Sequence, residues 1–367
     1  MTTARAKSKR ARAGRATPAT PRSRPVPPTR RTRAAGHAPR ALILATGLAL
    51  LVAVGLLGWD LTDAWRSAPP SADGQIAMPV AGGINLVDTA SGRSRQLLAG
   101  EANASVTAVA WSPDRSTLAY TLFHRRPDDR VSSAELFTIP AGGGTPTLVV
   151  PRPQPGTIVD APAWAPDGSA IFFAFQGVEN GKPVARIERV GIPDGSRQVL
   201  YGDASFPAVA RDGRSLAFAY DNGSGQALRV GSAAGGDARE LVGPTAFRGL
   251  MGPRFSPDGA WIAFTAVGPG PAGEAAPPDP RPTGLAAIFG VRVAEAHGDP
   301  WWVWKIRPDG RDLQRVGTLQ EDEPLIAWSR DGSWIAVHGT GGLWLLDPRG
   351  AVEPRRITDG TIGAIDW

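Results

Sequence analysis

A five-residue phrase, Trp-Ser-Pro-Asp-Gly or a close variant, recurs along this chain between short apolar segments. Its aspartates stand at positions 114, 167, 212, 258 and 331, which gives steps of 53, 45, 46 and 73 residues. Self-similarity near this period is typical of propellers and solenoids, in which each repeat buries its apolar face against the next one. The repeat therefore predicts an all-β fold built from successive blades.

Each phrase predicts a tight β-hairpin. Pro fixes φ at a turn position, Asp accepts hydrogen bonds within the turn, and Gly adopts the positive φ that a reversing backbone needs. The segments that follow, such as residues 169–175 and 334–337, are apolar and rich in aromatic and β-branched residues. A second Asp/Gly turn follows in most repeats. We therefore predict four strands per repeat, named a to d outward from the axis, with the a–b and c–d turns on one face.

The two ends of the repeat region complement each other. Residues 362–367 match a strand a that stops at its Trp, and residues 73–98 supply a turn followed by strands b, c and d. A blade assembled from both ends closes the ring through β-ladder hydrogen bonds and leaves no exposed sheet edge at the join. The prediction is a closed six-bladed β-propeller of four-stranded blades over residues 73–367.

These hairpins, the six repeats and the split blade resemble the TolB-type propeller repeat, which also occurs in the non-catalytic propellers of prolyl oligopeptidase and dipeptidyl peptidase relatives. The resemblance covers residues 73–367. It implies a fold rather than an activity, because the motif residues serve turns and core. The chain departs from the pattern at Arg115, where a turn Gly is usual, and at residues 209–211, where Val-Ala-Arg replaces Trp-Ser-Pro.

The N-terminal region predicts a location. Residues 1–40 contain twelve Lys or Arg and no acid, which is typical of a disordered segment. Residues 41–59 carry no charge, and as a helix they would be about 28 Å long, close to the ~30 Å hydrocarbon thickness of a bilayer. The positive-inside rule places the tail in the cytoplasm and, after a linker at 60–72, the propeller outside.

A cleaved twin-arginine-type signal peptide is the alternative, because Arg30 and Arg31 are adjacent. We favour an uncleaved anchor, since the apolar segment is long for a signal and Arg33-Ala34 lacks the hydrophobic pair expected there. The chain contains no cysteine, so it has neither disulfides nor thiol chemistry.

The net charge of +6 originates in the tail. Subtracting its twelve basic residues from the total of 40 leaves 28 Lys and Arg against 34 Asp and Glu. The folded part is thus mildly acidic and lacks the basic footprint that nucleic-acid binding requires. We interpret the tail as topogenic, with contact to anionic lipid as an alternative and nucleic acid as a third one.

No motif for nucleophilic, phosphate-binding or metal chemistry is present, so we assign no catalytic residue, no cofactor and no metal. His124 and His338 end strands b, and His297 lies in a b–c connection. All three should approach the face opposite the turns. They come from different blades, and solvent-exposed loop histidines are the preferred interpretation over a metal site.

One blade carries an insertion at residues 268–300, which begins rich in Pro, Gly and Ala and becomes apolar at 285–291. Long loops in compact domains often bind partners. The strand that follows starts Trp301-Trp302, so both of its faces are aromatic. We interpret one face as packed on the next blade and the other as covered by the loop, with a platform for a partner or glycan as the alternative.

Acidic residues precede several strands a, near the predicted mouth of the central channel. Solvated loop acids are the preferred interpretation, and an acidic mouth that attracts cations is the alternative. The acids are Glu101, Asp160, Asp203, Glu321, Asp322, Glu323 and Asp359.

The sequence thus predicts a membrane-anchored extracytoplasmic propeller that binds an envelope or extracellular protein, or a glycan, without catalysis. Two alternatives remain: a metal-dependent lactonase- or esterase-like propeller, and a sensor that signals to its cytoplasmic tail. The expected binding residues, all on the face opposite the turns, are His124, His297, Trp301, Trp302, His338, Asp160, Asp203 and Glu323.

Overall fold

The computed structural model describes residues 74–124, 133–152, 154, 156–221, 223, 225–268, 270 and 300–367. The predicted tail (1–40), membrane helix (41–59) and linker (60–72) lie outside these residues, as does most of the 268–300 insertion. Within the described part, the regular structure consists of β-strands. That part holds no helix with the length and apolar character needed to cross a membrane.

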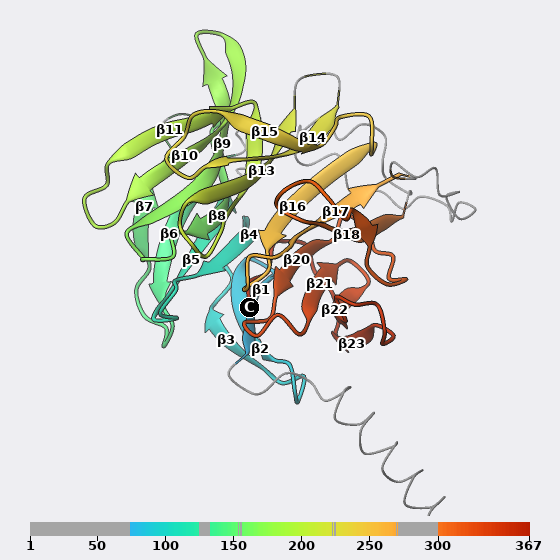
Figure 1. Cartoon of the computed structure of the whole chain (residues 1–367). Helices are drawn as coiled ribbons and strands as arrows, with labels where there is room; N and C mark the ends of the chain where they lie inside the picture. The colour runs from blue at the N-terminus through green and yellow to red at the C-terminus, as the bar shows by residue number, and fades with distance from the viewer. Residues whose placement is uncertain are drawn as a thin grey trace, which may run out of the picture. The chain divides into compact units, whose positions relative to one another are not determined.

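Six antiparallel sheets are arranged around a common axis, which confirms the six-bladed propeller (Figure 1). Blade 1 contains three named strands and a C-terminal segment described below, and blades 2 to 6 contain four strands each. In chain order the strands are β1 (Gln75–Val80), β2 (Gly83–Asp88) and β3 (Ser94–Leu98); β4 (Ala104–Trp111), β5 (Thr117–His124), β6 (Ser133–Pro140) and β7 (Thr147–Val150); β8 (Ile158–Trp164), β9 (Ala170–Glu179), β10 (Lys182–Gly191) and β11 (Arg197–Gly202); β12 (Ala204–Val209), β13 (Ser215–Asp221), β14 (Gln226–Ser232) and β15 (Ala238–Val242); β16 (Gly249–Phe255), β17 (Ile262–Val267), β18 (Trp301–Ile306) and β19 (Gln314–Arg315); and β20 (Leu325–Trp328), β21 (Ile335–Gly339), β22 (Gly342–Leu346) and β23 (Arg355–Thr358).

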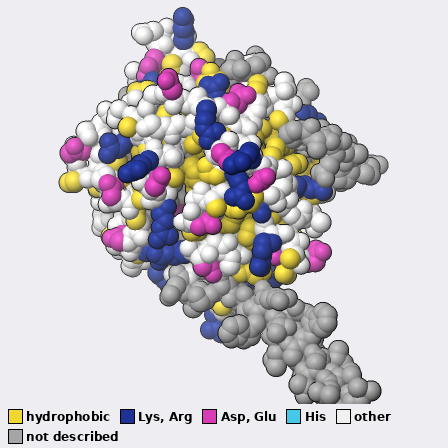
Figure 2. Space-filling model, in the orientation of Figure 1, with side chains coloured by type: hydrophobic (Ala, Val, Ile, Leu, Met, Phe, Trp, Pro, Cys, Tyr) yellow, Lys and Arg dark blue, Asp and Glu magenta, His cyan; other side chains and the backbone are white. Residues whose placement is uncertain are grey.

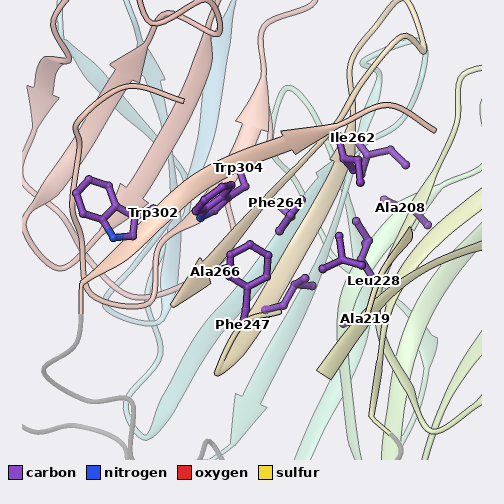
Figure 3. Packing of buried hydrophobic residues seen from close by; sticks show 13 residues of the cluster. Ala208, Ala219, Leu228, Phe247, Ile262, Phe264, Ala266, Trp302 and Trp304 are labelled. Atoms are coloured by element: carbon purple, nitrogen blue, oxygen red, sulfur yellow. The ribbon is translucent and has the colours of Figure 1, made fainter. Parts of the chain in front are cut away.

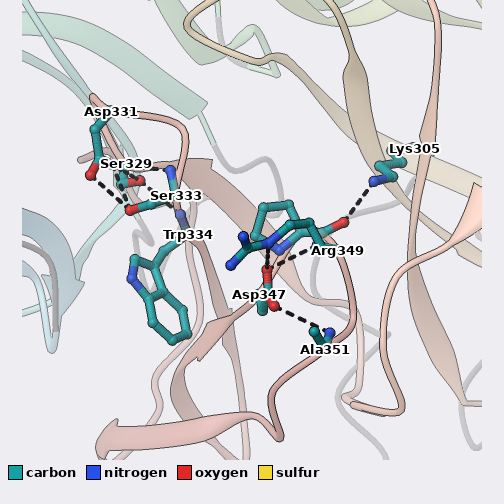
Figure 4. A network of polar contacts seen from close by, with 9 residues as sticks. Lys305, Ser329, Asp331, Ser333, Trp334, Asp347, Arg349 and Ala351 are labelled. Atoms are coloured by element: carbon teal, nitrogen blue, oxygen red, sulfur yellow. Dashed lines mark hydrogen bonds and ion pairs between the residues drawn. The ribbon is translucent and has the colours of Figure 1, made fainter. Parts of the chain in front are cut away.

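The repeated phrase forms the predicted hairpin turn, and its Ser and Asp cooperate. In blade 6 the hydroxyl of Ser329 donates to Asp331 (2.6 Å) and accepts from the amide of Trp334 (2.9 Å). Asp331 also accepts from the amide of Ser333 (3.0 Å; Figure 4). Because the Ser329 hydroxyl both donates and accepts, it satisfies the carboxylate of Asp331 in the turn and the amide of Trp334 next to strand b.

The turn glycine adopts the predicted left-handed conformation in four hairpins. Gly168, Gly213, Gly259 and Gly332 have φ values of 73°, 69°, 70° and 71°. Arg115 occupies the same position in blade 2 and has a φ of 61°. A non-glycine residue is strained there, because its Cβ approaches its own backbone.

The Trp of the phrase joins neighbouring blades. The indole of Trp164 donates to the carbonyl oxygen of Ala110 in blade 2 (3.1 Å), and that of Trp328 donates to the carbonyl oxygen of Arg254 in blade 5 (3.2 Å). Each ring thus packs in the core while its polar N–H is satisfied by the preceding inner strand. The phrase therefore specifies both the hairpin and the way that blades stack.

The C-terminal segment completes blade 1 as predicted. Asp366 and Ala77 exchange two backbone hydrogen bonds, of 2.8 and 3.2 Å, in an antiparallel bridge. On the other side, Ala364 forms a parallel bridge with Ala108 of blade 2. Ile365 and Trp367 are buried in a cluster shared by blades 1 and 6. The last strand is therefore held by ladder bonds and by apolar packing.

Six of the seven hydrophobic clusters among the described residues lie between adjacent blades. The cluster between blades 4 and 5 brings Leu228 together with Phe264, Trp304 and Phe247 (Figure 3). The ring of Phe247 meets that of Trp304 edge-on, with centroids 5.0 Å apart. Each fully buried side chain of this kind contributes about 1.5–3 kcal/mol, so the stability of each blade depends on its neighbours.

A polar network adds to the contact between blades 5 and 6. Lys305 of β18 donates to the carbonyl oxygen of Pro348 (2.7 Å) and lies over the ring of Trp261. Burial lowers the pKa of Lys305. Asp347, which is also buried, accepts from the amides of Arg349 (3.0 Å) and Ala351 (3.2 Å; Figure 4).

Candidate functional site

The propeller has two different faces. The turn face carries the a–b and c–d turns, and the loop face carries the b–c and d–a connections. On the loop face, strands β9 and β10 extend for ten residues each and end in a tight turn at Asn180-Gly181. The described ends of the 268–300 insertion leave from the same face, as strands β17 and β18 are b and c of blade 5.

Strained backbone is concentrated on the loop face. Among the described residues, nine other than glycine have positive φ; five of them lie in b–c turns or d–a connections, and two lie inside inner strands. Arg115 and Asp312 are the two on the turn face. Such conformations cost energy and cluster at sites where function requires them. The five loop residues are Ala81, Asn103, Asn180, Asp203 and Glu323, and the two strand residues are Ala161 and Phe206.

Three inner strands share a bulge followed by proline. Ala161 (φ 52°), Phe206 (φ 53°) and Gly252 (φ 58°) each precede a Pro, in β8, β12 and β16. The pairing with strand b shifts register at these positions. Bulges turn side chains away from the regular alternation and are over-represented next to functional sites. The inner strands therefore present irregular backbone to the axis near the loop face.

Asp160, the first residue of one bulge, closes a triangle of oxygen atoms. Its Oδ1 lies 2.9 Å from the hydroxyls of Thr107 and Thr121, and these hydroxyls are 2.7 Å apart. The three oxygen–oxygen contacts need three donated protons, and the two hydroxyls supply only two. A protonated carboxyl of Asp160 supplies the third proton. Burial raises the pKa of Asp160, which agrees with this count. The group fastens blade 2 to blade 3 beside the axis.

His338 is buried, so the expectation of an exposed loop histidine is wrong at this position. Its exposed fraction is 1%. Nδ1 lies 2.8 Å from the carbonyl oxygen of Gly363, and Nε2 accepts from the amide of Thr361 (3.0 Å). This pattern requires a neutral ring with its proton on Nδ1. Desolvation lowers the pKa of His338, and its partners belong to the segment that closes the ring.

The other predicted polar residues do not converge. His124 contacts Glu135 on the neighbouring strand (3.1 Å). Asp203 is exposed and lies between β11 and β12. Its backbone amide donates to the carbonyl oxygen of Ala185 (2.8 Å), which holds this connection in place. Glu323 is half-buried in the connection before β20. His297 lies outside the described residues. Across the described ranges, no three His, Asp or Glu side chains are close enough to share a metal ion.

Trp301 and Trp302 are part of the core of the propeller. Their exposed fractions are 1% and 8%. Trp302 belongs to the cluster between blades 4 and 5, and Trp301 packs against Val267 and Met251. All six residues of β18 are buried, so both faces of this strand are covered and consecutive aromatic residues suit it.

Sequence reasoning missed a charged cluster on the axis near the turn face. Asp366 accepts from the amide of Trp111 (2.7 Å) and lies within electrostatic reach of Arg254 and Arg115. Arg330 acts in turn on Arg115. Burial raises the pKa of Asp366, although both guanidinium groups oppose this shift. One signal was available: Arg115 and Arg330 stand where the phrase usually has Gly and Pro.

Blade 3 also has a charged hollow that the sequence did not indicate. Glu188 is buried between Arg186 (2.7 Å) and Arg197 (2.5 Å). These three residues line a cavity of about 340 Å³ together with Phe175, Glu179, Gln198 and Val199. The carboxylate is fully paired by the two arginines. Elsewhere, basic and acidic side chains are interspersed over the face shown in Figure 2.

Comparisons with known proteins agree with this architecture. No family model matches the chain. Over 162 residues, or 44% of this chain, the sequence is 28% identical to the uncharacterized peptidase YuxL of Bacillus subtilis (strain 168). That match covers 22% of YuxL, so it concerns a small part of the relative.

Two solved structures are similar in fold. TolB from Acinetobacter baumannii has a TM-score of 0.58 and 16% identity, over 84% of this chain and 69% of TolB. A chain of a nidogen/laminin complex has a TM-score of 0.55 and 12% identity, over 80% of this chain and 97% of its own length. At these identities the similarity concerns the fold alone. The chain is therefore a six-bladed β-propeller. Its fold is TolB-like.

Proposed function

We propose that this protein is an extracytoplasmic binding propeller, tethered to the membrane through residues 41–59, whose loop face binds an envelope or extracellular protein. The concentration of strained backbone carries the proposal, since five of the nine described positive-φ residues other than glycine lie in loops of that face and only two lie in loops of the turn face. A scaffold retains such strain where it positions a binding surface. The TolB-like fold supports a binding module.

Apolar side chains on the loop face favour a protein over a glycan. Ile362, which begins the last strand beside the axis, is 54% exposed. Val178, near the tip of the β9–β10 hairpin, is 61% exposed. A protein partner would bury both side chains, at about 25 cal/mol per Å² of apolar surface. Asp203, which is exposed, supplies an acidic group on the same side.

The proposed topology rests on the charge asymmetry around residues 41–59. The absence of native cysteine allows a direct test. One full-length variant carries Gln96→Cys, on an exposed position of β3, and a matched variant carries Ser23→Cys in the tail. A membrane-impermeant maleimide should label only Gln96→Cys in intact cells and both after lysis. Labelling of Ser23→Cys in intact cells would contradict the orientation.

Catalysis is the second candidate, favoured by the partial similarity to the peptidase YuxL. A lactonase- or esterase-like activity would need metal ligands around the axis. The full-length protein should be assayed against peptide, ester and lactone substrates with and without a chelator. Hydrolysis that chelation abolishes would establish an enzyme. A cytosolic partner lost on deletion of residues 1–40 would instead support the sensor alternative.

A further inference from the structure

The chain bends at residues 361–363, just before the last strand, and one side chain supplies most of the hydrogen bonds of this closing bend. The carbonyl oxygen of Gly363 lies 2.8 Å from Nδ1 of His338, and the amide of Thr361 donates to Nε2 (3.0 Å). The hydroxyl of Thr361 donates to the carbonyl oxygen of Pro79 in blade 1 (2.6 Å). The position of the closing bend therefore depends largely on His338 of blade 6.

His338 can hold the closing bend only while its ring is neutral. The proton on Nδ1 points at Gly363, so the lone pair of Nε2 accepts from the amide of Thr361. Protonation would place a second N–H at Nε2, facing that amide. The new N–H can reach the Thr361 hydroxyl, 3.1 Å away, but the amide loses its acceptor. A proton on His338 thus breaks one of the bonds that fix the bend.

The surroundings of His338 do not compensate a positive charge. The strands that pack against it, β20, β22 and β1, contain no charged residue. Burial lowers the pKa of His338, although the carbonyl oxygen of Gly363 opposes this shift, and no acid of the described residues contributes to it. A charged ring is therefore favoured only when the bend opens and water reaches it. The acids in the adjoining segments are Glu321, Asp322 and Glu323 before β20, Asp359 before the closing bend and Asp366 after it.

The closing bend can open while the last strand stays in the ring. Ala364 and Asp366 are held by bridges to Ala108 and Ala77, and these bridges do not involve His338. Local opening is easiest where few hydrogen bonds hold partly exposed backbone, as they do at residues 361–363. The middle residue of the bend, Ile362, is 54% exposed on the loop face. Opening of the bend therefore displaces an apolar side chain of that face.

We propose that His338 is a pH switch of the loop face, whose protonation releases the closing bend and displaces Ile362 while residues 364–367 remain in place. Each pH unit below about 6.5 favours the open, protonated form by up to about tenfold. Acid then weakens the loop-face binding proposed above, because Ile362 no longer has a fixed position. This consequence rests on the proposed function, whereas the opening itself does not.

Site-directed spin labelling of the full-length protein in detergent tests the switch. A nitroxide on Ile362→Cys is the only label, because the chain has no native cysteine. Between pH 8 and pH 5 we expect the mobile fraction of its spectrum to rise severalfold. Adding His338→Gln, whose amide can donate and accept without titrating, should abolish the rise. Adding His124→Gln, which replaces a half-exposed histidine, should not change it.

A label at Gln96→Cys, on an exposed position of β3, is the control for unfolding and should keep its spectrum. An unchanged spectrum at position 362 overturns the proposal, as does an equal rise with His338→Gln. A parallel rise at position 96 also overturns it, because the whole propeller would then be unfolding. None of these measurements needs a partner, so the switch and the loop-face binding can fail separately. Partner crosslinks from position 362 that persist at pH 5 would overturn the effect on binding alone.

Discussion

The carboxylate of Asp366 accepts a hydrogen bond from the backbone amide of Trp111, 2.7 Å away and 255 positions earlier in the chain. The last strand is thus fixed to blade 2 by a side chain, in addition to its ladder bonds with blade 1. Trp111 is the Trp of the first repeated phrase, and Trp367 is the corresponding residue of the last strand. Ring closure therefore joins the first and last repeats directly.

Truncating the Trp at the end of the ring should destabilise the whole propeller. Trp367→Ala removes a buried ring from the cluster between blades 1 and 6, which should cost about 3–5 kcal/mol of unfolding free energy. Ile362→Ala, in the same segment but exposed, should change it by no more than about 0.5 kcal/mol. Denaturant unfolding of the full-length protein measures both. Equal midpoints for Trp367→Ala and wild type would contradict the closed ring.

His338 should make ring closure sensitive to acid. Burial lowers its pKa below 6.5, so the unfolded chain binds a proton more readily than the native protein. The stability that the neutral ring provides is complete above pH 6.5 and is lost as the pH falls through the native pKa. Melting temperatures between pH 8 and 5 should show this loss in wild type and in His124→Gln, but a smaller one in His338→Gln. If melting temperature depended on pH in the same way in all three proteins, the assigned role of His338 would be contradicted.

Asp160 should behave in the opposite sense. Its raised pKa means that the native state binds a proton more readily than the unfolded chain. Its contribution to stability is therefore complete below pH 3.8 and is lost as the pH rises through the native pKa. Asp160→Asn keeps the shape and the acceptor without the charge. The variant should melt at or above the wild-type temperature at pH 7, with the difference shrinking toward pH 4. A large loss at pH 7 would show that the site requires the ionised carboxylate.

The repeated phrase made the fold predictable because its signals are local. Pro, Asp and Gly within five residues specify a turn, and the spacing of turns determines the blade count. The axial cluster was not predictable, since Arg254 and Asp366 approach each other only after the ring closes. Similarly, the position of His338 in a strand gave no sign that the last segment of the chain covers its ring. Trp301 and Trp302 were ambiguous because their strand is buried on both faces.

Arg115 allows backbone strain and side-chain contacts to be separated. Its positive φ costs about 1 kcal/mol relative to Gly, whereas its charged hydrogen bond to Gln75 contributes about 1.5–3 kcal/mol. Arg115→Ala loses the contacts and keeps the strain, and Arg115→Gly loses both. Wild type should melt at the highest temperature, Arg115→Gly at an intermediate one and Arg115→Ala at the lowest. An Ala variant more stable than the Gly variant would contradict the assigned conformation.

Site-specific photo-crosslinking tests the proposed loop-face interaction most directly. A photoreactive residue replaces Ile362 on the loop face in one full-length protein and Arg214 on the turn face in another, both at exposed positions. After irradiation of native membranes, we expect a discrete crosslinked protein from position 362 and none from position 214. Crosslinks from position 214 alone would place the partner on the turn face and contradict the proposal.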